Sequence, residues 1–426
     1  MRILLLGSGG REHAMAWRIN QSNMTDELFI APGNPGMESL GKIFPDIQVN
    51  NFEGIASLAL KENIDLLVVG PEDPLVHGIT DYFALKPELR HIRIAGPCAQ
   101  GAKLEGSKDF SKAFMLKYGI PTAAYRTFTS ETIHEANEYL KTLKAPYVLK
   151  ADGLAAGKGV IIAQSLEEAQ SELKEMLGGR FGNAGNRIVI EEFLQGIECS
   201  VFVACDGRDY RILPVAKDYK RIGDGDTGPN TGGMGAISPV KFADKDFMSK
   251  VEERIIKPTI HGLIQENIDY KGFIFIGLMN VAGEPYVIEY NCRLGDPETE
   301  AIMLRIKSDF ADMLYRIASG SLADYQLEID PRTVATVIMV SGGYPGEYQK
   351  GFEILMPLDS DETILFHAGT KRDGHSIVTN GGRVVAISSY GSDIASAIER
   401  SYAKASQVVF EGKNYRHDIG KDLMNL

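Results

Sequence analysis

Three polar side chains at alternate positions of a predicted strand are the residues of this sequence best placed to do chemistry. The stretch VIEYNCRLGDPETE opens with the apolar Val287 and Ile288, and Glu289, Asn291 and Arg293 follow. Side chains two apart on a strand point to the same face, so a carboxylate, an amide and a guanidinium would stand in one row. A buried carboxylate needs a cation, which either Arg293 or a divalent metal could supply. Glutamate and asparagine oxygens suit Mg²⁺, and Arg293 would then face a phosphoryl group during its transfer.

A glycine-rich loop between two predicted strands is the second candidate. In KADGLAAGKGV three residues separate Gly153 from Gly157, and Gly159 rather than a hydroxyl residue follows Lys158, so the loop is not a P-loop. Because it joins two strands, it fits a mobile glycine-rich hairpin above a triphosphate, with Lys150 reaching the phosphate oxygens. A solvated lysine is the alternative for Lys150.

The N-terminal loop GSGGREH lies between a predicted strand and a predicted helix. A dinucleotide fingerprint would need glycine at the position of Glu12, which disfavours a nicotinamide dehydrogenase. Backbone N–H groups at a helix N-terminus still suit an anion; an ordinary turn is the alternative.

A further stretch, IVIEEFLQGIE, places Glu191, Glu192 and Glu198 around a chain reversal. Such a segment can offer backbone groups to an adenine and a carboxylate to ribose hydroxyls. A plain acidic strand end is the alternative.

Composition narrows the class of protein. The net charge of −12 argues against a general binder of nucleic acid or of membrane surfaces. No apolar run approaches the ~18 residues of a membrane span. The four cysteines form no CxxC pair and are expected to be buried in a reducing compartment. We therefore expect a cytoplasmic protein without nucleic-acid or membrane partners.

The elements that must position these residues fall into three segments. In residues 1–102 strands alternate with helices, which predicts a parallel sheet with ligand-binding loops at the carboxyl ends of its strands. The predicted strands are Arg2–Leu6, Glu27–Ile30, Asp65–Val69 and Ile92–Ala95, and the predicted helices are Arg11–Asn20 and Ile55–Asn63.

The middle segment, residues 103–329, pairs strands and segregates helices, which is typical of α+β subdomains. A hairpin forms around the glycine-rich loop, and a capping box at Ser165–Glu168 opens a helix. We expect a long loop with little structure of its own at Ile222–Ser238. The predicted helices are Lys103–Tyr118, Thr132–Leu143 and Asp244–Glu266, the last one bent at Pro258, and the predicted strands are Ile188–Glu192, Ser200–Ala204, Phe273–Val281 and Pro285–Asn291.

The last segment, residues 330–426, predicts a small α+β domain with strands Thr333–Val340 and Arg383–Ser389 and a helix Asp393–Val409. The fold class is therefore α/β and α+β multidomain: an N-terminal parallel-sheet domain, a central domain with a flap at about residues 123–194, and a C-terminal domain.

The order of these features resembles the ATP-grasp superfamily. A lysine in SKDF (Lys108), a lysine before a glycine-rich hairpin, an acidic hinge and a Glu-x-Asn-x-Arg strand follow one another. Over nearly the whole chain the motifs GSGGREHA, APGNPG, VGPEDPL, LEGSK, KADGLAAGKGV, DTGPNTGGMGA, EYNCRLGDPET, HAGT and NGGRV resemble the phosphoribosylamine–glycine ligase family. On this resemblance the N-terminal domain is a pre-ATP-grasp domain and the central one a two-subdomain ATP-grasp core.

The resemblance implies an ATP-dependent ligase of purine biosynthesis. Glycine is joined to 5-phosphoribosylamine through glycyl phosphate, giving glycinamide ribonucleotide, ADP and phosphate. ATP is a co-substrate, Mg²⁺ or Mn²⁺ is the metal, and the state implied is a monomer or a weak homodimer without a fused later activity.

Residue roles follow by matching motifs. The resemblance implies that ATP contacts Lys108, Lys150, Gly157, Lys158, Glu191, Glu192, Phe193, Leu194 and Glu198. It implies substrate contacts at Gly9, Gly10, Arg11, Glu12, Asn34, Pro71, Glu72, Asp73, Asp218, Lys220, Arg221, Gly295 and Asp296. Glu289 and Asn291 would bind the metal, and Arg293 would be catalytic.

Two positions depart from common patterns. Many ATP-grasp enzymes carry an acidic ligand on the strand that here reads FIFIGLMNV, which has none; the resembled family shares that gap. In DYKR, Tyr219 stands where relatives often have histidine, so no proton-transfer role is assigned there.

Two other functions stay open at this point. Another ATP-grasp enzyme, such as a carboxylase, would share Glu289 and Asn291 and depend on bicarbonate. A nucleotide-binding protein without turnover is the second, although Lys150, Glu289, Asn291 and Arg293 are all retained.

Overall fold

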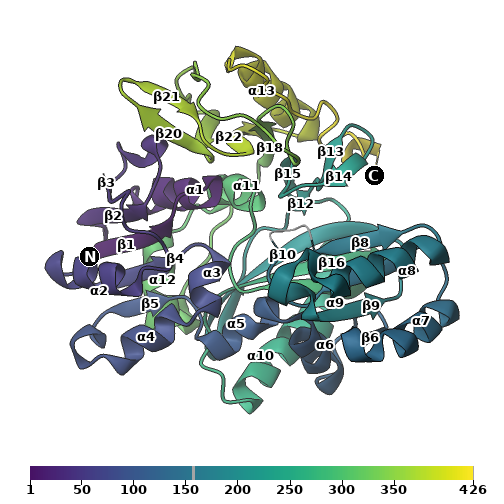
Figure 1. Cartoon of the computed structure of the whole chain (residues 1–426). Coiled ribbons are helices and arrows are strands. Elements are labelled where there is room, and N and C mark those ends of the chain that lie inside the picture. Colours follow the sequence, from purple (N-terminus) through teal and green to yellow (C-terminus); the bar gives the residue numbers. More distant parts are fainter. Residues whose placement is uncertain (156–158, 426) are drawn as a thin grey trace.

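The computed structural model describes residues 1–155 and 159–425. Its N-terminal part is the predicted parallel sheet, with strand order β3-β2-β1-β4-β5, shown at the left of Figure 1. The strands are β1 Arg2–Gly7, β2 Glu27–Pro32, β3 Lys42–Ile43, β4 Leu66–Val69 and β5 Arg93–Ala95. The helices are α1 Gly10–Ile19, α2 Phe52–Lys61, α3 Glu72–Val76 and α4 Ile79–Leu85.

The predicted helix Lys103–Tyr118 is wrong, because two helices meet there. Ser107 is extended (φ −143°, ψ 115°) and separates α5, Ala99–Gly106, from α6, Lys108–Lys117. Its hydroxyl accepts a hydrogen bond from the N–H of Phe110, which caps α6. Apolar periodicity runs across this break, so the pattern alone did not reveal it.

The flap is a four-stranded sheet of order β6-β9-β7-β8, shown at the right of Figure 1. It comprises β6 Tyr125–Thr129, β7 Tyr147–Ala151, β8 Val160–Ala163, β9 Arg187–Glu191, α7 Ile133–Thr142 and α8 Leu166–Glu175. The predicted hairpin is confirmed, because β7 and β8 pair antiparallel. The capping box is only half formed: Ser165 caps α8, but the Glu168 carboxylate accepts from the N–H of Gln164 instead of Ser165.

A second four-stranded sheet, β11-β10-β16-β17, forms the floor of the central segment. The predicted helix Asp244–Glu266 is divided into α9 and α10 by a π-helical segment, Glu252–Ile256, just before Pro258. The elements are β10 Ile197–Asp206, β11 Tyr210–Ile212, β16 Lys271–Val281, β17 Glu284–Asn291, α9 Lys245–Val251, α10 Lys257–Gln265, α11 Glu298–Arg305 and α12 Phe310–Ser319.

The predicted loop Ile222–Ser238 is wrong, because it contains most of a hairpin and a sheet strand. Residues β13 Arg221–Gly223 and β14 Thr227–Asn230 pair with each other, and β15 Gly235–Ser238 joins the C-terminal sheet. That sheet has the order β12-β15-β18-β22-β19. Because β15 is ordered by backbone pairing with β18, about a hundred residues away, its own glycine-rich sequence shows no strand pattern.

The C-terminal segment is at the top of Figure 1 and packs against the N-terminal sheet domain. Its elements are β18 Thr333–Val340, β19 Thr363–His367, β20 Thr370–Asp373, β21 Ser376–Thr379, β22 Arg383–Gly391 and α13 Ile394–Gln407. The middle segment adds β12 Lys217–Asp218 and β15 to its sheet. The predicted strands at Thr333–Val340 and Arg383–Ser389 and the terminal helix are confirmed.

Two buried clusters explain how these parts hold together. One joins Leu5 of β1, Phe202 of β10 and Val334 of β18, so all three segments share a core. The flap has a separate cluster that includes Leu149, Leu173 and Ile190. No helix in the described part of the chain combines the length and the apolar character needed to cross a membrane.

Candidate active site

A β-bulge explains the polar row at the end of β17. Gly277 of β16 pairs with Glu289, but the next residue, Leu278, pairs with Val287, which leaves Ile288 as an extra residue. The bulge resets the alternation, so Val287 and Tyr290 both enter the core while Glu289 and Asn291 take the other face. A strand can therefore begin apolar and still present oxygen ligands to the cleft.

The cation facing Glu289 is not Arg293, so the ion-pair hypothesis is wrong. Among the described residues, no basic nitrogen lies within ion-pair distance of the Glu289 carboxylate. Burial alone would raise the pKa of Glu289, but Lys220, Lys150 and Lys108 together hold it below its usual value. An ionised carboxylate that no described basic residue pairs with, on the same strand face as the Asn291 amide, matches what Mg²⁺ needs from a protein.

The wider donor set also fits that metal. Within the described residues, no three histidine, cysteine or acidic side chains gather as a metal site. Mg²⁺ usually takes only one or two protein carboxylates and completes its shell with phosphates and water, which two ligands on one strand would allow.

Arg293 is held by two carboxylates from distant elements. Its Nε donates to Glu72 Oε2 at 3.1 Å, and its Nη2 donates to Glu105 Oε1 at 2.9 Å. The same Glu105 accepts from the N–H of Cys292 at 2.8 Å. The arginines Arg293 and Arg11 lower the pKa of Glu72 to about 2, against the opposing effect of burial. Arg293 is thus fixed before any substrate arrives.

Two lysines share one glutamate beneath the flap. Lys150 Nζ lies 3.0 Å from Glu191 Oε2 and donates to the Ile288 carbonyl at 3.0 Å. Lys112 Nζ lies 3.3 Å from the same Glu191 oxygen and donates to Thr122 Oγ1. Burial lowers the pKa of Lys112 to about 8, although Glu191 opposes the shift. Lys150 is therefore a buried, anchored cation, and the solvated alternative is wrong.

Lys108 begins α6 and adds a third cation to this region. Burial lowers its pKa, Glu289 works in the opposite direction, and Lys150 lowers it further. The backbone N–H of Lys108 donates to the Asp152 carbonyl at 3.1 Å, which ties α6 to the end of β7. Gly157 and Lys158 lie outside the described residues.

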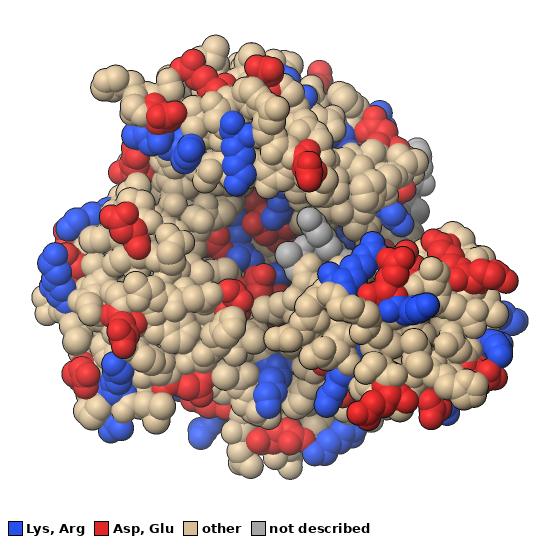
Figure 2. All heavy atoms as spheres, viewed as in Figure 1, with Lys and Arg blue, Asp and Glu red and all other residues tan. Residues whose placement is uncertain are grey.

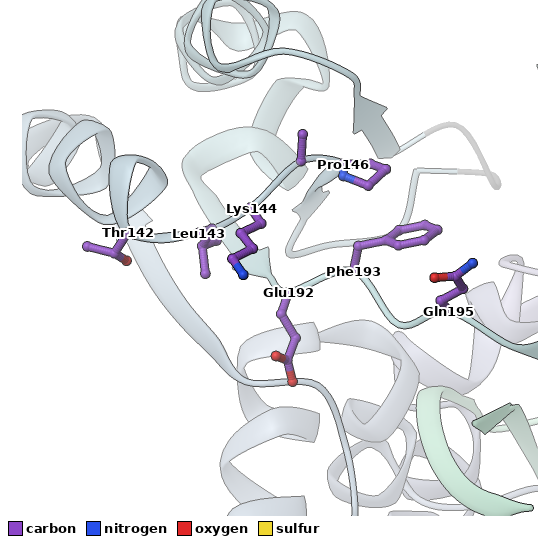
Figure 3. Close-up of a pocket in the computed structure, with 8 residues that line it drawn as sticks. Thr142, Leu143, Lys144, Pro146, Glu192, Phe193 and Gln195 are labelled. Atoms are coloured by element: carbon purple, nitrogen blue, oxygen red, sulfur yellow. The ribbon is translucent and has the colours of Figure 1, made fainter. Parts of the chain in front are cut away.

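The acidic hinge between β9 and β10 borders a pocket of about 610 Å³. Figure 3 shows Phe193 and Glu192 pointing in different directions from the hinge, and Pro146 lines the same pocket. Glu192 accepts from the N–H of Ala124 at 2.9 Å, and Leu194 is half-buried. Thr142, Leu143, Lys144, Ala145 and Gln195 complete the lining.

The DYKR segment sends alternate side chains to opposite sides. Lys220 Nζ lies 3.0 Å from Glu198 Oε2, and burial raises the pKa of Asp218 despite Lys220. Tyr219 points away from them and donates to Asp422 Oδ1 at 2.6 Å near the C-terminus. Arg221 donates to the Gly228 carbonyl within its own hairpin.

The N-terminal loop is closed by its own glutamate. Glu12 Oε2 accepts from the N–H of Gly9 at 2.8 Å, and its other oxygen lies 2.5 Å from Arg11 Nε. A Cβ at Gly7, where φ is +128°, would meet Glu12 Cγ at 2.3 Å. The Glu12 carboxylate therefore folds back over the glycines of the loop and accepts the N–H of Gly9.

The other predicted substrate residues lie around this loop. Asn34 donates to the carbonyls of Ser8 and His367, and Asp73 accepts from Asn50. Pro71 precedes α3, which carries Glu72. A Cβ built on Gly10 would meet Glu300 Oε1 at 2.3 Å, and one built on Gly295 would meet Glu298 Oε2 at 2.4 Å.

Sequence reasoning missed five charged residues of this region. Glu105 and Arg383 lie inside the motifs LEGSK and NGGRV, so motif membership was the available signal. Glu298 and Glu300 lie inside the quoted stretch VIEYNCRLGDPETE, so the same signal was available for them. Lys112 carried no local signal, because its contacts come from distant elements. Burial and the nearby Asp218 raise the pKa of Glu298 to about 7, and Glu298 accepts from Ser200 Oγ at 2.8 Å.

Charged side chains line one hollow of the molecule. Figure 2 shows basic and acidic side chains gathered in the depression at the centre of this face, between the three parts of the molecule. The arrangement can hold a polyphosphate between lysines, keep two oxygen ligands for a cation, and hold a fixed guanidinium beside them.

Comparisons with known proteins follow the same division of the chain. Three family models match in order: Phosphoribosylglycinamide synthetase N domain at residues 1–105, ATP-grasp (A) domain at 106–299 and C domain at 334–422. The chain is 44% identical to a phosphoribosylamine–glycine ligase of Vibrio cholerae and 45% identical to one of Escherichia coli K12, in each case over 99% of this chain and 98% of the relative.

Solved structures agree with the fold. The crystal structure of a phosphoribosylamine–glycine ligase from Thermotoga maritima is 37% identical, covers 98% of this chain and all of its own, and has a TM-score of 0.84. A biotin carboxylase domain from Hydrogenobacter thermophilus reaches a TM-score of 0.72 over 97% of this chain and 91% of its own at 17% identity, which shows a shared fold alone.

Proposed function

Because the chain belongs to the phosphoribosylamine–glycine ligase family, we propose that its central hollow joins glycine to 5-phosphoribosylamine at the expense of ATP. The observation that carries the site assignment is the bulged end of β17, which presents Glu289 and Asn291 beside Lys108, Lys150 and Lys220. The products are glycinamide ribonucleotide, ADP and phosphate, in purine biosynthesis.

ATP binding is assigned to the hinge and the lysines. Backbone groups from Glu191 to Leu194 face adenine, Glu198 takes the ribose, and Lys108 and Lys150 take phosphate oxygens. Support comes from Lys150, which two acceptors hold in place so that little side-chain freedom is lost on binding. Gly157 and Lys158 belong to the proposed flap loop.

Two bond exchanges make up the proposed reaction. An oxygen of the glycine carboxylate bonds to the γ-phosphorus while the bond to the β–γ bridging oxygen breaks, and ADP leaves. The amine nitrogen of phosphoribosylamine then bonds to the acyl carbon, the bond from that carbon to the phosphate oxygen breaks, and the departing phosphate takes up the proton that the amine loses. Fixed cations stabilise charge on the transferring group without reorganising, and Arg293 is already oriented by Glu72 and Glu105.

Metal binding is assigned to Glu289 and Asn291. A bound Mg²⁺ or Mn²⁺ would neutralise phosphate charge during transfer. Both side chains lie on the cleft face of β17, and the lysines that keep Glu289 ionised keep it ready to bind a cation.

The substrate side is assigned to three N-terminal loops with Asp218, Lys220, Arg221, Gly295 and Asp296 across the hollow. The loops are those of Gly9–Glu12, Asn34 and Pro71–Asp73. The domain bounds 1–102, 103–329 and 330–426, a cytoplasmic location and a monomeric or weakly dimeric state are part of the same proposal.

ADP release tests the proposed reaction. ATP and Mg²⁺ are supplied with glycine and freshly generated phosphoribosylamine, separately and together. ADP formation that depends on both, with a matching amount of glycinamide ribonucleotide, is expected. Turnover that requires bicarbonate instead would move the protein to a carboxylase, and nucleotide binding without turnover under every condition would contradict an enzyme.

A further inference from the structure

The C-terminal segment is anchored on the N-terminal domain through the HAGT motif. The N–H of His367 donates to His13 Nδ1 at 2.8 Å, and Asn34 Nδ2 donates to the His367 carbonyl at 2.9 Å. His13 and Asn34, which belong to the N-terminal domain, are both buried. The turn after β19 is therefore fixed to the loops that line one wall of the hollow.

The same turn fixes the start of β22. The N–H of Gly369 donates to the Arg383 carbonyl at 2.8 Å, and the Gly369 carbonyl accepts from the N–H of Asn380 at 2.7 Å. A Cβ at Gly369 would come within 2.5 Å of the Gly381 Cα and of the Arg383 carbonyl oxygen. HAGT and NGGRV are thus two halves of one backbone contact that requires glycine.

From that contact Arg383 reaches into the hollow. Its Nη1 donates to the Gly232 carbonyl at 2.7 Å and to the Asp296 carbonyl at 2.8 Å, and its Nη2 lies 3.0 Å from Asp296 Oδ1. The N–H of Gly232 donates to the hydroxyl of Tyr344, a second residue of the C-terminal segment, at 2.9 Å. Both polar groups of Gly232 are consequently held by the C-terminal segment.

The Asp296 carboxylate lies between two domains. Its Oδ1 faces Arg383, and a Cβ built on Gly9 of the N-terminal loop would lie 3.5 Å from its Oδ2. Gly232 and Gly233 border the same place, since a Cβ at Gly233 would meet the Pro297 ring at 2.4 Å. Lys150 and Lys112 both contact Glu191 on the flap side.

We infer that Arg383 is a positioning residue for the proposed reaction, through which the C-terminal segment sets the Asp296 carboxylate and the Gly232 peptide to receive phosphoribosylamine. The inference rests on the proposed function and gives the C-terminal segment a role in it. Arg383 acts through Asp296 and Gly232. The ATP phosphates are assigned to other residues, Lys108 and Lys150.

Substitution of Arg383 tests this role, because the kinetic constants for each substrate can be measured separately in the variant. Arg383→Gln should raise KM for phosphoribosylamine about 10-fold or more, as expected when a charge-assisted hydrogen bond is lost. KM for ATP and the Kd of ATP should stay within about twofold of wild type. Arg383→Lys, which keeps the charge, should recover part of the lost affinity for phosphoribosylamine.

Two further variants sharpen the test. Arg372→Gln, a matched control in the same segment, removes an exposed ion pair with Glu38 and should leave every kinetic constant unchanged. Tyr344→Phe removes only the hydroxyl that holds Gly232 and should raise the same KM by a smaller factor; it serves as the test if Arg383→Gln does not fold.

The outcomes separate the inference from the proposed function. Equal rises in KM for all three substrates, together with a lower Tm, would mean that Arg383 is only structural and would overturn the inference. Unchanged kinetic constants in folded Arg383→Gln or in folded Tyr344→Phe would also overturn the inference. A wild-type chain that makes no glycinamide ribonucleotide would instead contradict the proposed function itself.

Discussion

Charged side chains in the hollow differ in whether they have a partner. The guanidinium of Arg293 has two carboxylates within 3.1 Å, and Lys150 has a carboxylate and a carbonyl at 3.0 Å. Several lysines lower the pKa of Glu289, but no described lysine nitrogen lies within ion-pair distance of its carboxylate. Because a half-buried carboxylate without an ion-pair partner among the described residues is costly, Glu289 favours a cation that arrives with the ligands.

Glu289→Gln should abolish most turnover while the fold persists. The amide keeps the shape of the side chain but removes the charge that would bind the metal. We expect kcat to fall at least about 100-fold, since even residues behind metal ligands commonly cost 10–100-fold. Turnover and Mn²⁺ affinity are measured beside Glu284→Gln, an exposed carboxylate of the same strand. Normal activity and Mn²⁺ binding in Glu289→Gln would exclude the metal assignment.

Lys150→Met should weaken ATP binding without unfolding the chain. Glu191 keeps Lys112 as its counter-ion, so no buried charge is left alone. Loss of a charge-assisted hydrogen bond to phosphate predicts a Kd for ATP about 10- to 100-fold higher. Equilibrium binding is compared with Lys141→Met, which removes an exposed lysine of α7. If the two variants bound ATP alike, Lys150 would not contact the phosphates.

Two local breaks of regular structure place the chemical groups at the scale of elements. The bulge at Ile288 turns Glu289 and Asn291 toward the hollow, and the break at Ser107 starts a new helix at Lys108. Asp152, just after β7, accepts from the Ser107 hydroxyl at 3.0 Å and from the N–H of Asp109 at 2.8 Å. The start of α6 is thereby tied to the end of the strand that carries Lys150.

Ser107→Ala should therefore affect both stability and nucleotide binding. Loss of the N-cap costs about 1 kcal/mol of stability, and release of the first turn of α6 should raise the Kd for ATP several-fold. Ser165→Ala is the matched control, because it removes the cap of α8 in the flap at a similar cost. The expected pattern is a lower Tm in both variants and weaker ATP binding only in Ser107→Ala. Unchanged ATP binding in Ser107→Ala would show that this N-cap does not affect the nucleotide site.

At the scale of the whole molecule, the N- and C-terminal segments meet through two buried histidines. Burial lowers the pKa of His13 to about 3, and it lowers that of His367 to about 4. His13 must stay neutral because its Nδ1 accepts from the N–H of His367. Protonation of His13 would remove that acceptor and place a charge between the two segments.

The pH dependence of stability follows from this interface. Because the folded pKa of His13 lies below its ordinary value of 6.5, its contribution is fully present above pH 6.5 and is lost as pH falls toward 3. For one such group the loss at pH 5 is about 2 kcal/mol. His13→Asn, whose amide oxygen can accept the same hydrogen bond, should show a smaller fall in Tm between pH 7.5 and pH 5.

An exposed histidine provides the control for that experiment. His134 lies on the surface of the flap. His134→Asn should therefore show the same fall in Tm between pH 7.5 and pH 5 as wild type. If His13→Asn also lost stability as steeply as wild type on acidification, the pH response would belong to other groups.

Much of the architecture was predictable because its signals are local. Four of the five strands of the first sheet, the β7–β8 hairpin and the strands at Thr333–Val340 and Arg383–Ser389 follow from apolar runs bounded by glycine and proline. The motifs identified the family on their own, since each is a short run of neighbouring residues in the sequence. The predictions failed where order comes from distant partners: β15 pairs with β18, and Ser107 bonds to Asp152.

The sequence by itself determined which chemical groups are available, their order along the chain and the family to which the chain belongs. Tertiary structure decided which of those groups meet. Arg293 pairs with Glu72 and Glu105 instead of Glu289, Lys112 joins Lys150 on Glu191, and Arg383 reaches Asp296 from the opposite end of the chain. The physical reason is that a buried charge takes whatever partner the packed core brings within about 3–4 Å, and spacing along one strand does not report that distance.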